Sequence, residues 1–140
     1  MPPTILIVDD QELIIRIVQS ALRPLGAALP AVRMGRDVVR YVEESGVPNA
    51  IILDFSMPDQ DGVETLRQIR RLATGGAIPV VMLTARDQTL IRKEADGLHV
   101  HAFMTKPFSP STLLQTLKEM LPAEAQPGTL PFPTGNPEGI

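Results

Sequence analysis

Acidic, hydroxyl and amino side chains follow the short apolar runs of this 140-residue chain. Asp9 and Asp10 follow the first run, and Asp54 follows a later one. Thr84 and Lys106 come after the last two. Three carboxylates in one site repel one another, so one of them holds its proton unless a cation neutralises the cluster. Such oxygen ligands suit Mg²⁺, which keeps several waters and binds a substrate phosphate. A hydroxyl and an ammonium beside that cation favour nucleophilic attack on phosphorus, giving an aspartyl phosphate.

Each of these residues has an ordinary structural interpretation when it is taken alone. Asp9 and Asp10 stand where an aspartate commonly caps a helix, and Asp54 precedes a segment rich in turn residues. Lys106 is more informative, since the chain's other two lysines fall within helical patterns and Pro107 keeps Lys106 out of helical geometry. Capping does not explain a lysine and a threonine at the same place, so the combination favours a reactive site.

The apolar runs predict strands. Continuous, β-branched runs at residues 5–8, 50–53 and 79–83 suit strands that are buried on both faces. Weaker strands are expected at residues 100–104 and at 27–32, where Pro30 indicates a position near the sheet edge. Ligands of an open α/β sheet bind beyond the carboxyl ends of its strands, so the reactive side chains are expected to meet at one edge.

Helical patterns separate these strands. Apolar side chains at three- and four-residue spacing predict a helix over 13–25, ended by Gly26. Ser109 and Pro110 suit the cap and first residue of the last helix. The other predicted helices cover residues 37–44, 62–72 and 87–97, and the last covers 109–121. Five strand–helix repeats predict an α/β fold, a doubly wound parallel sheet with helices on both faces.

The composition narrows the class of protein. Thirteen basic and 16 acidic residues give a formal net charge of −3, without a basic patch that would bind nucleic acid. The absence of cysteine excludes disulfides, thiolate metal sites and cysteine nucleophiles. The apolar runs are too short for a membrane helix and no leader pattern precedes the first, so a cytoplasmic location without membrane contact is expected. We expect one domain over residues 1–122 and a flexible, Pro- and Gly-rich tail or linker over 123–140.

Four segments carry a family resemblance. They read ILIVDD at 5–10, ILDFSMPDQDG at 52–62, LTA at 83–85 and FMTKPF at 103–108. In order and spacing they resemble the receiver domain of bacterial two-component response regulators, over about residues 3–122. The resemblance implies the five-stranded, flavodoxin-like (βα)5 form of the predicted fold, with strand order 2-1-3-4-5.

The resemblance implies a phosphoacceptor and its metal site. Asp54 would accept the phosphoryl group. Mg²⁺, for which Mn²⁺ can substitute, would bind Asp10 and Asp54 through their carboxylates, Ser56 through its backbone carbonyl and Asp9 through a water. Ser56 and Arg86, two residues after the acceptor and two after the threonine, would flank the attacking water and tune dephosphorylation.

The resemblance also implies a donor and a switch. A phosphohistidine on a sensor histidine kinase or a histidine phosphotransfer protein would supply the phosphoryl group. Thr84 and Lys106 would contact its oxygens, and Phe103 is in the position of the family's switch aromatic. The fourth helix, fifth strand and fifth helix would then present a changed face to a downstream protein effector or to a second copy of the chain. Such a domain is not an enzyme, although it assists its own phosphorylation and dephosphorylation.

Other readings of the same residues fit less well. A haloacid-dehalogenase-type phosphatase needs an Asp-x-Asp nucleophile, which the adjacent pair Asp9-Asp10 does not supply. A calcium loop around residues 59–62 lacks carboxylates at its first and last ligand positions. His99 and His101 share one face of a strand but have no evident third metal ligand.

The output of the domain has two open interpretations. The chain is either a stand-alone receiver that signals by protein contact, or the receiver of a longer regulator with a DNA-binding or enzymatic effector domain beyond Ile140. The Pro- and Gly-rich segment fits both a free end and a linker. A receiver that never takes phosphate is disfavoured by the complete acceptor set.

Overall fold

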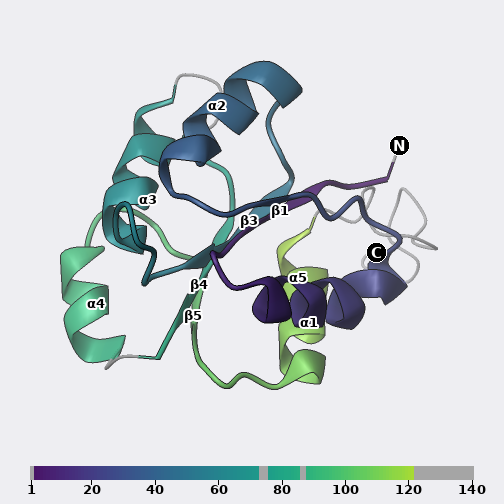
Figure 1. Ribbon diagram of the computed structural model, residues 1–140. Coiled ribbons are helices and arrows are strands. Elements are labelled where there is room, and N and C mark those ends of the chain that lie inside the picture. Colours follow the sequence, from purple (N-terminus) through teal and green to yellow (C-terminus); the bar gives the residue numbers. More distant parts are fainter. Residues whose placement is uncertain (1, 73–75, 86–87, 122–140) are drawn as a thin grey trace, which may run out of the picture.

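The computed structural model describes residues 2–72, 76–85 and 88–121. A parallel five-stranded sheet runs through its centre, in the order β2-β1-β3-β4-β5 (Figure 1). The strands are β1 (Ile5–Val8), β2 (Ala31–Val32), β3 (Ala50–Asp54), β4 (Val80–Thr84) and β5 (Ala102–Thr105). This arrangement confirms the predicted doubly wound, flavodoxin-like α/β fold and its strand order.

Five helices cover the two faces of the sheet. They are α1 (Glu12–Leu22), α2 (Arg36–Ser45), α3 (Gly62–Arg71), α4 (Gln88–Glu94) and α5 (Pro110–Met120). Figure 1 shows α1 and α5 together on one face, with α2, α3 and α4 on the other. Among the described residues, no helix is both long and apolar enough to cross a membrane.

Alternation along the central strands produces two hydrophobic cores. In β1, Ile5 and Ile7 pack with α1 and α5, whereas Leu6 and Val8 belong to the core on the opposite face. All four side chains of β1 are buried, which explains why the strand reads as an unbroken apolar run. Burial of one such side chain contributes about 1.5–3 kcal/mol, so the central strands form a rigid frame for their carboxyl ends.

The end of the first helix differs from the sequence prediction because of a proline. The first helix ends at Leu22 instead of residue 25, and a 3₁₀ turn over Arg23–Leu25 follows it. Pro24 has no N–H for an α-helical bond to the Ser20 carbonyl, and the Arg23 N–H bonds to that carbonyl instead. The chain then turns at Gly26 in the left-handed conformation, with φ of 64°.

The edge strand and the fourth helix are also shorter than predicted. Strand β2 has only two residues, because Pro30 before it cannot donate to a sheet ladder. Helix α4 ends at Glu94, and the chain leaves it through a turn that includes Gly97 with φ of 82°. The cap of α5 agrees with the prediction, since Ser109 Oγ accepts a hydrogen bond from the Thr112 N–H at 3.3 Å.

Candidate functional site

The sheet register brings two aspartates together from distant parts of the sequence. Val8 on β1 is paired with Leu53 on β3, so the residues that follow them, Asp9 and Asp54, lie at the same edge. Both aspartates are almost completely buried, at 1% and 3% exposure, whereas Asp10 is exposed at the rim. The central strands therefore hold two carboxylates where little water reaches them.

The neighbouring strands add a hydroxyl and a lysine. Thr84 is the last residue of β4, is 1% exposed, and is paired with Thr105, directly before Lys106. The Lys106 Nζ lies 2.9 Å from Asp54 Oδ1 and 3.1 Å from Asp9 Oδ2. The side chain of Lys106 is itself only 16% exposed, so this is a partly buried ion triad rather than a surface salt bridge.

The charges of this triad do not balance. Burial raises the pKa of Asp54 and the neighbouring charge of Asp9 raises it further, while the hydrogen bond from Lys106 offsets only part of the effect. Burial alone would lower the pKa of Lys106, but its bonds to the two carboxylates outweigh that and raise it. One ammonium shared by two buried carboxylates leaves a net negative charge, with Asp10 nearby. The site is therefore electrostatically suited to a further cation.

The donor atoms fit a small divalent cation. Asp9, Asp10 and Asp54 each offer a carboxylate oxygen, and the three oxygens lie within 4.8 Å of one another. Asp10 and Asp54 border a hollow of about 210 Å³, which is also lined by Gln11, Ser56, Ala85 and Lys106. An all-oxygen set with an open side matches the preference of Mg²⁺, which is held by a few carboxylates and retains waters.

The two carboxylates have different protein partners. Asp9 Oδ1 accepts the Gln11 N–H at 2.9 Å, so Asp9 also orders the turn into α1, and its other oxygen accepts from Lys106. Asp54 Oδ1 accepts the Ser56 N–H at 3.3 Å. Both oxygens of Asp9 thus have protein donors. Neither Asp9 nor Asp10 caps the helix, because the cap residue of α1 is Gln11 and no side-chain cap hydrogen bond is made there.

Phe103 and Thr105 on β5 have partners on α4 that the sequence did not reveal. The ring is half-buried on β5, and the Arg92 guanidinium of α4 lies 4.4 Å from its centroid. Gln88 Nε2, at the start of α4, donates to Thr105 Oγ1 at 2.5 Å. These pairs were missed because nothing in residue spacing indicates which face of α4 meets β5. Arg86, expected from the sequence to tune dephosphorylation, lies outside the described residues.

The alternatives at other positions are not supported. Asp59 caps α2 and Asp61 caps α3, so the acidic residues of the suggested calcium loop have structural roles. His99 and His101 are exposed, and within the described ranges the three aspartates are the only group of three or more possible metal-binding side chains.

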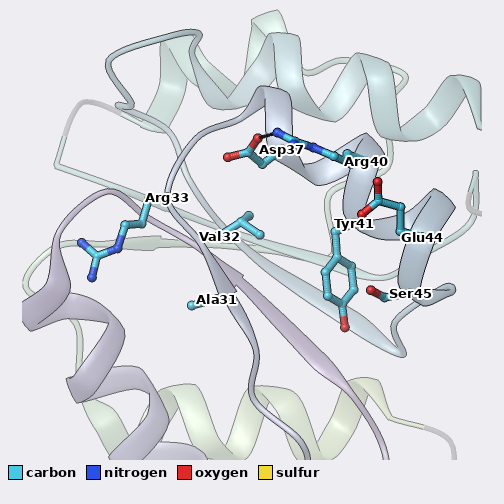
Figure 2. A pocket seen from close by; sticks show the side chains of 8 residues that line it. All are labelled: Ala31, Val32, Arg33, Asp37, Arg40, Tyr41, Glu44 and Ser45. Carbon is cyan, nitrogen blue, oxygen red and sulfur yellow. Dashed lines mark hydrogen bonds and ion pairs between the residues drawn. The ribbon is translucent and has the colours of Figure 1, made fainter.

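A second hollow, of about 440 Å³, lies beside β2 and α2. Figure 2 shows its lining, which includes Tyr41 and the ion pair between Arg40 and Asp37 on α2. None of the residues that line it belongs to the aspartate and lysine cluster.

Comparison with known proteins decides the family. The model of the response regulator receiver domain matches residues 5–118. The chain belongs to this family. The predicted resemblance is thereby confirmed, and the chain is a receiver domain of two-component response regulators, a class of signalling domains rather than classical enzymes.

Relatives of this receiver domain are known in sequence and in structure. It is 33% identical to the response regulator MprA of Mycolicibacterium vanbaalenii over 123 residues, covering 86% of this chain and 51% of that protein. It is 32% identical to the alkaline phosphatase synthesis transcriptional regulatory protein PhoP of Bacillus subtilis over 121 residues, with 86% and 49% covered. The chain therefore spans about half the length of these curated relatives.

Solved structures of response regulators are similar over most of the chain. The chemotaxis response regulator CheY4 of Vibrio cholerae is similar with a TM-score of 0.78 and 27% identity, over 86% of this chain and all of that one. The phosphorylated cyanobacterial phytochrome response regulator RcpA is similar with a TM-score of 0.73 and 29% identity, over 86% and 91% of the two chains.

Proposed function

We propose that this receiver domain accepts a phosphoryl group on Asp54 from a phosphohistidine of a sensor histidine kinase or a histidine phosphotransfer protein. The observation that carries the proposal is the ion triad, in which Lys106 bridges buried Asp54 and Asp9 next to exposed Asp10. A carboxylate oxygen of Asp54 attacks phosphorus. The bond from phosphorus to the donor imidazole nitrogen breaks, and its electron pair stays on that nitrogen.

In this proposal the residues of the site have different roles, some in metal binding and one in phosphate binding. Asp10, Asp54 and the Ser56 carbonyl would hold Mg²⁺ directly, and Asp9 would hold it through a water. When bound, the cation would neutralise charge that develops on the phosphoryl oxygens in the transition state. Lys106, already within hydrogen-bond distance of Asp54, then pairs with a phosphoryl oxygen.

We propose that the phosphorylated site is read on the face formed by α4, β5 and α5. The Thr84 hydroxyl contacts the new phosphoryl group, and Phe103 turns inward as the threonine moves. Arg92 contacts the Phe103 ring, and Gln88 bonds Thr105, the last residue of the same strand. Movement of Phe103 therefore alters the contact of Arg92 and with it the packing of α4 on β5. The readers of this face are a downstream protein effector or a second copy of the chain.

A second candidate function concerns how the domain passes on its signal, and the greater length of its relatives favours it. The chain spans 49% of a protein named as a transcriptional regulatory protein. We therefore propose, as an alternative, a longer regulator. In it, residues 1–122 form the receiver, a linker begins at residue 123, and a DNA-binding or enzymatic effector domain follows. In both cases we propose a cytoplasmic receiver domain that makes no direct contact with nucleic acid or membrane.

Phosphorylation from a small donor tests the proposal. Incubation with acetyl phosphate and Mg²⁺ should add one phosphoryl group by intact mass to the natural sequence but none to Asp54→Asn, and EDTA should abolish the addition. Asp61→Asn is the matched control, because it makes the same chemical change at an exposed helix cap. Equal labelling of the natural sequence and Asp54→Asn would overturn the assignment of Asp54.

A further inference from the structure

The segment between β3 and α3 forms a closed loop that carries part of the site. The Gly62 N–H donates to the Phe55 carbonyl at 2.7 Å, so the two ends of the 55–62 loop are joined. A Cβ on Gly62 would lie 2.8 Å from Phe55 Cα, which restricts this close approach to glycine. Ser56, whose N–H donates to Asp54 Oδ1, is in the first part of the loop. The position of the loop therefore affects the orientation of the Asp54 carboxylate.

The same loop is bonded to a helix that contributes nothing directly to the site. Asp59 Oδ1 accepts the Gly35 N–H at 3.0 Å, and Asp59 Oδ2 accepts the Arg36 N–H at 2.9 Å. Gly35 is the cap residue of α2 and has no side chain with which to satisfy these groups. Asp59 therefore caps α2 from a different part of the chain, with one carboxylate oxygen on each N–H.

The start of α2 also packs closely on this loop. A Cβ on Gly35 would collide with Thr65 Oγ1 and would lie 2.6 Å from Gln60 Cγ. Thr65 is completely buried, and Gln60 Nε2 donates to its hydroxyl at 2.8 Å. The contact between α2 and the loop thus depends on two separate features. One is the pair of hydrogen bonds to the Asp59 carboxylate, and the other is the absence of a side chain at Gly35.

We propose that Asp59 is a positioning residue of the acceptor site. By capping α2 it fixes the 55–62 loop against a rigid helix, and so fixes the Ser56 backbone that borders the hollow and orients Asp54. This inference rests on the proposed role of the hollow as a cation and phosphoryl site. Residues that hold a ligand's neighbours in place commonly affect metal affinity by 10-fold or more, although they never touch the ion.

A comparison of five variants of the full chain tests this role. Asp59→Ala removes the two hydrogen bonds, and Gly35→Ala disturbs the same contact without changing any charge. Asp61→Ala removes a cap and a negative charge from the same loop, and Asp37→Ala removes a negative charge from the first turn of α2. Mg²⁺ binding is followed by the backbone amide chemical shifts of Asp54 and Ser56, and folding by thermal unfolding.

We expect both Asp59→Ala and Gly35→Ala to raise the Mg²⁺ dissociation constant about 10-fold. The two controls should stay within about twofold of the natural sequence. Asp59→Asn, which keeps one acceptor oxygen, should be intermediate, and it serves as the readout if Asp59→Ala does not fold. The rate of Asp54 labelling by acetyl phosphate at subsaturating Mg²⁺ should fall in the same order.

Other results would overturn the inference in distinguishable ways. Equal Mg²⁺ affinity in Asp59→Ala and Asp61→Ala would show that Asp59 caps α2 without any specific effect on the acceptor site. Weak binding in Asp59→Ala together with normal binding in Gly35→Ala would assign the effect to charge instead of position. No amide response of the natural sequence to Mg²⁺ would contradict the proposed function itself, and this inference with it.

Discussion

Lys106 Nζ lies 2.9 Å from Asp54 Oδ1, although 52 residues separate the two in the sequence. Parallel strands β3 and β5 both end at the same edge of the sheet, with β4 between them. The same ammonium also pairs with Asp9, so one positive charge serves two buried carboxylates. This shortage of positive charge suits the site to a divalent cation. Burial, and after it the charge of Asp9, keeps the pKa of Asp54 raised despite its lysine partner.

Removal of the lysine should make stability depend on Mg²⁺. Lys106→Met leaves the carboxylates of Asp9 and Asp54 facing each other without a cation, and we expect a loss of about 2–3 kcal/mol in EDTA. Mg²⁺ should recover most of that loss by neutralising the pair. Urea unfolding with and without Mg²⁺ measures both effects, with Lys93→Met on the exposed side of α4 as the control. A loss that is the same in EDTA and in Mg²⁺ would contradict this account.

The raised pKa of Asp54 gives a prediction for pH. A carboxyl group whose pKa is higher in the folded than in the unfolded protein stabilises the fold in its protonated form, and loses that contribution as the pH rises through the folded-state pKa. In EDTA at neutral pH, Asp54→Asn should therefore be more stable than the natural sequence. The difference should shrink as the pH is lowered toward the ordinary range of aspartate. Urea unfolding at a series of pH values measures it, and a difference that grows on acidification would refute the prediction.

Phe103 should affect how α4 and β5 respond to phosphorylation more than it affects phosphorylation itself. Its ring contacts Arg92 on α4 and does not line the hollow beside Asp54, so Phe103→Ala should label with acetyl phosphate at a rate within about twofold of the natural sequence. Phosphorylation should, however, change hydrogen exchange over α4 and β5 much less in this variant. Arg92→Ala loses a cation–π contact of about 0.5–1 kcal/mol and should raise exchange in α4 before any phosphorylation. A block of labelling in Phe103→Ala would make the residue part of the site's structure.

Arg70 should be needed for stability at the opposite end of the sheet. Its guanidinium donates to four backbone carbonyls that precede β4 and β5, those of Gly76, Ile78, Leu98 and His99. Arg70→Met should cost about 2 kcal/mol in unfolding free energy. Arg70→Lys should not restore it, because an ammonium cannot reproduce the planar fork of donors. Exposed Arg71→Met is the control, and a fully stable Arg70→Lys would show that charge alone suffices.

The sequence predicts the strands and helices of this molecule better than the side-chain hydrogen bonds that join its loops. Strands β1, β3 and β4 are visible as buried apolar runs, and the aspartates, threonine and lysine directly follow such runs. The bonds from Asp59 to α2 and from Arg70 to distant carbonyls are different, because they join loops through backbone groups that every residue possesses. No periodicity marks such partners. The helix boundary at Leu22 was missed for a local reason, since Pro24 interrupts an apolar pattern that continues to Leu25.

The most direct test is the position of the phosphoryl group. The acyl phosphate formed with acetyl phosphate and Mg²⁺ is reduced with borohydride, and the chain is then cleaved after arginine and lysine. Asp54 falls in the peptide 41–67, whereas Asp9 and Asp10 fall in the peptide 1–16. We predict that the reduced product appears only in peptide 41–67, with fragmentation locating it at Asp54. A product in peptide 1–16, or at another acidic residue of 41–67, would contradict the assignment of Asp54 as the phosphoacceptor.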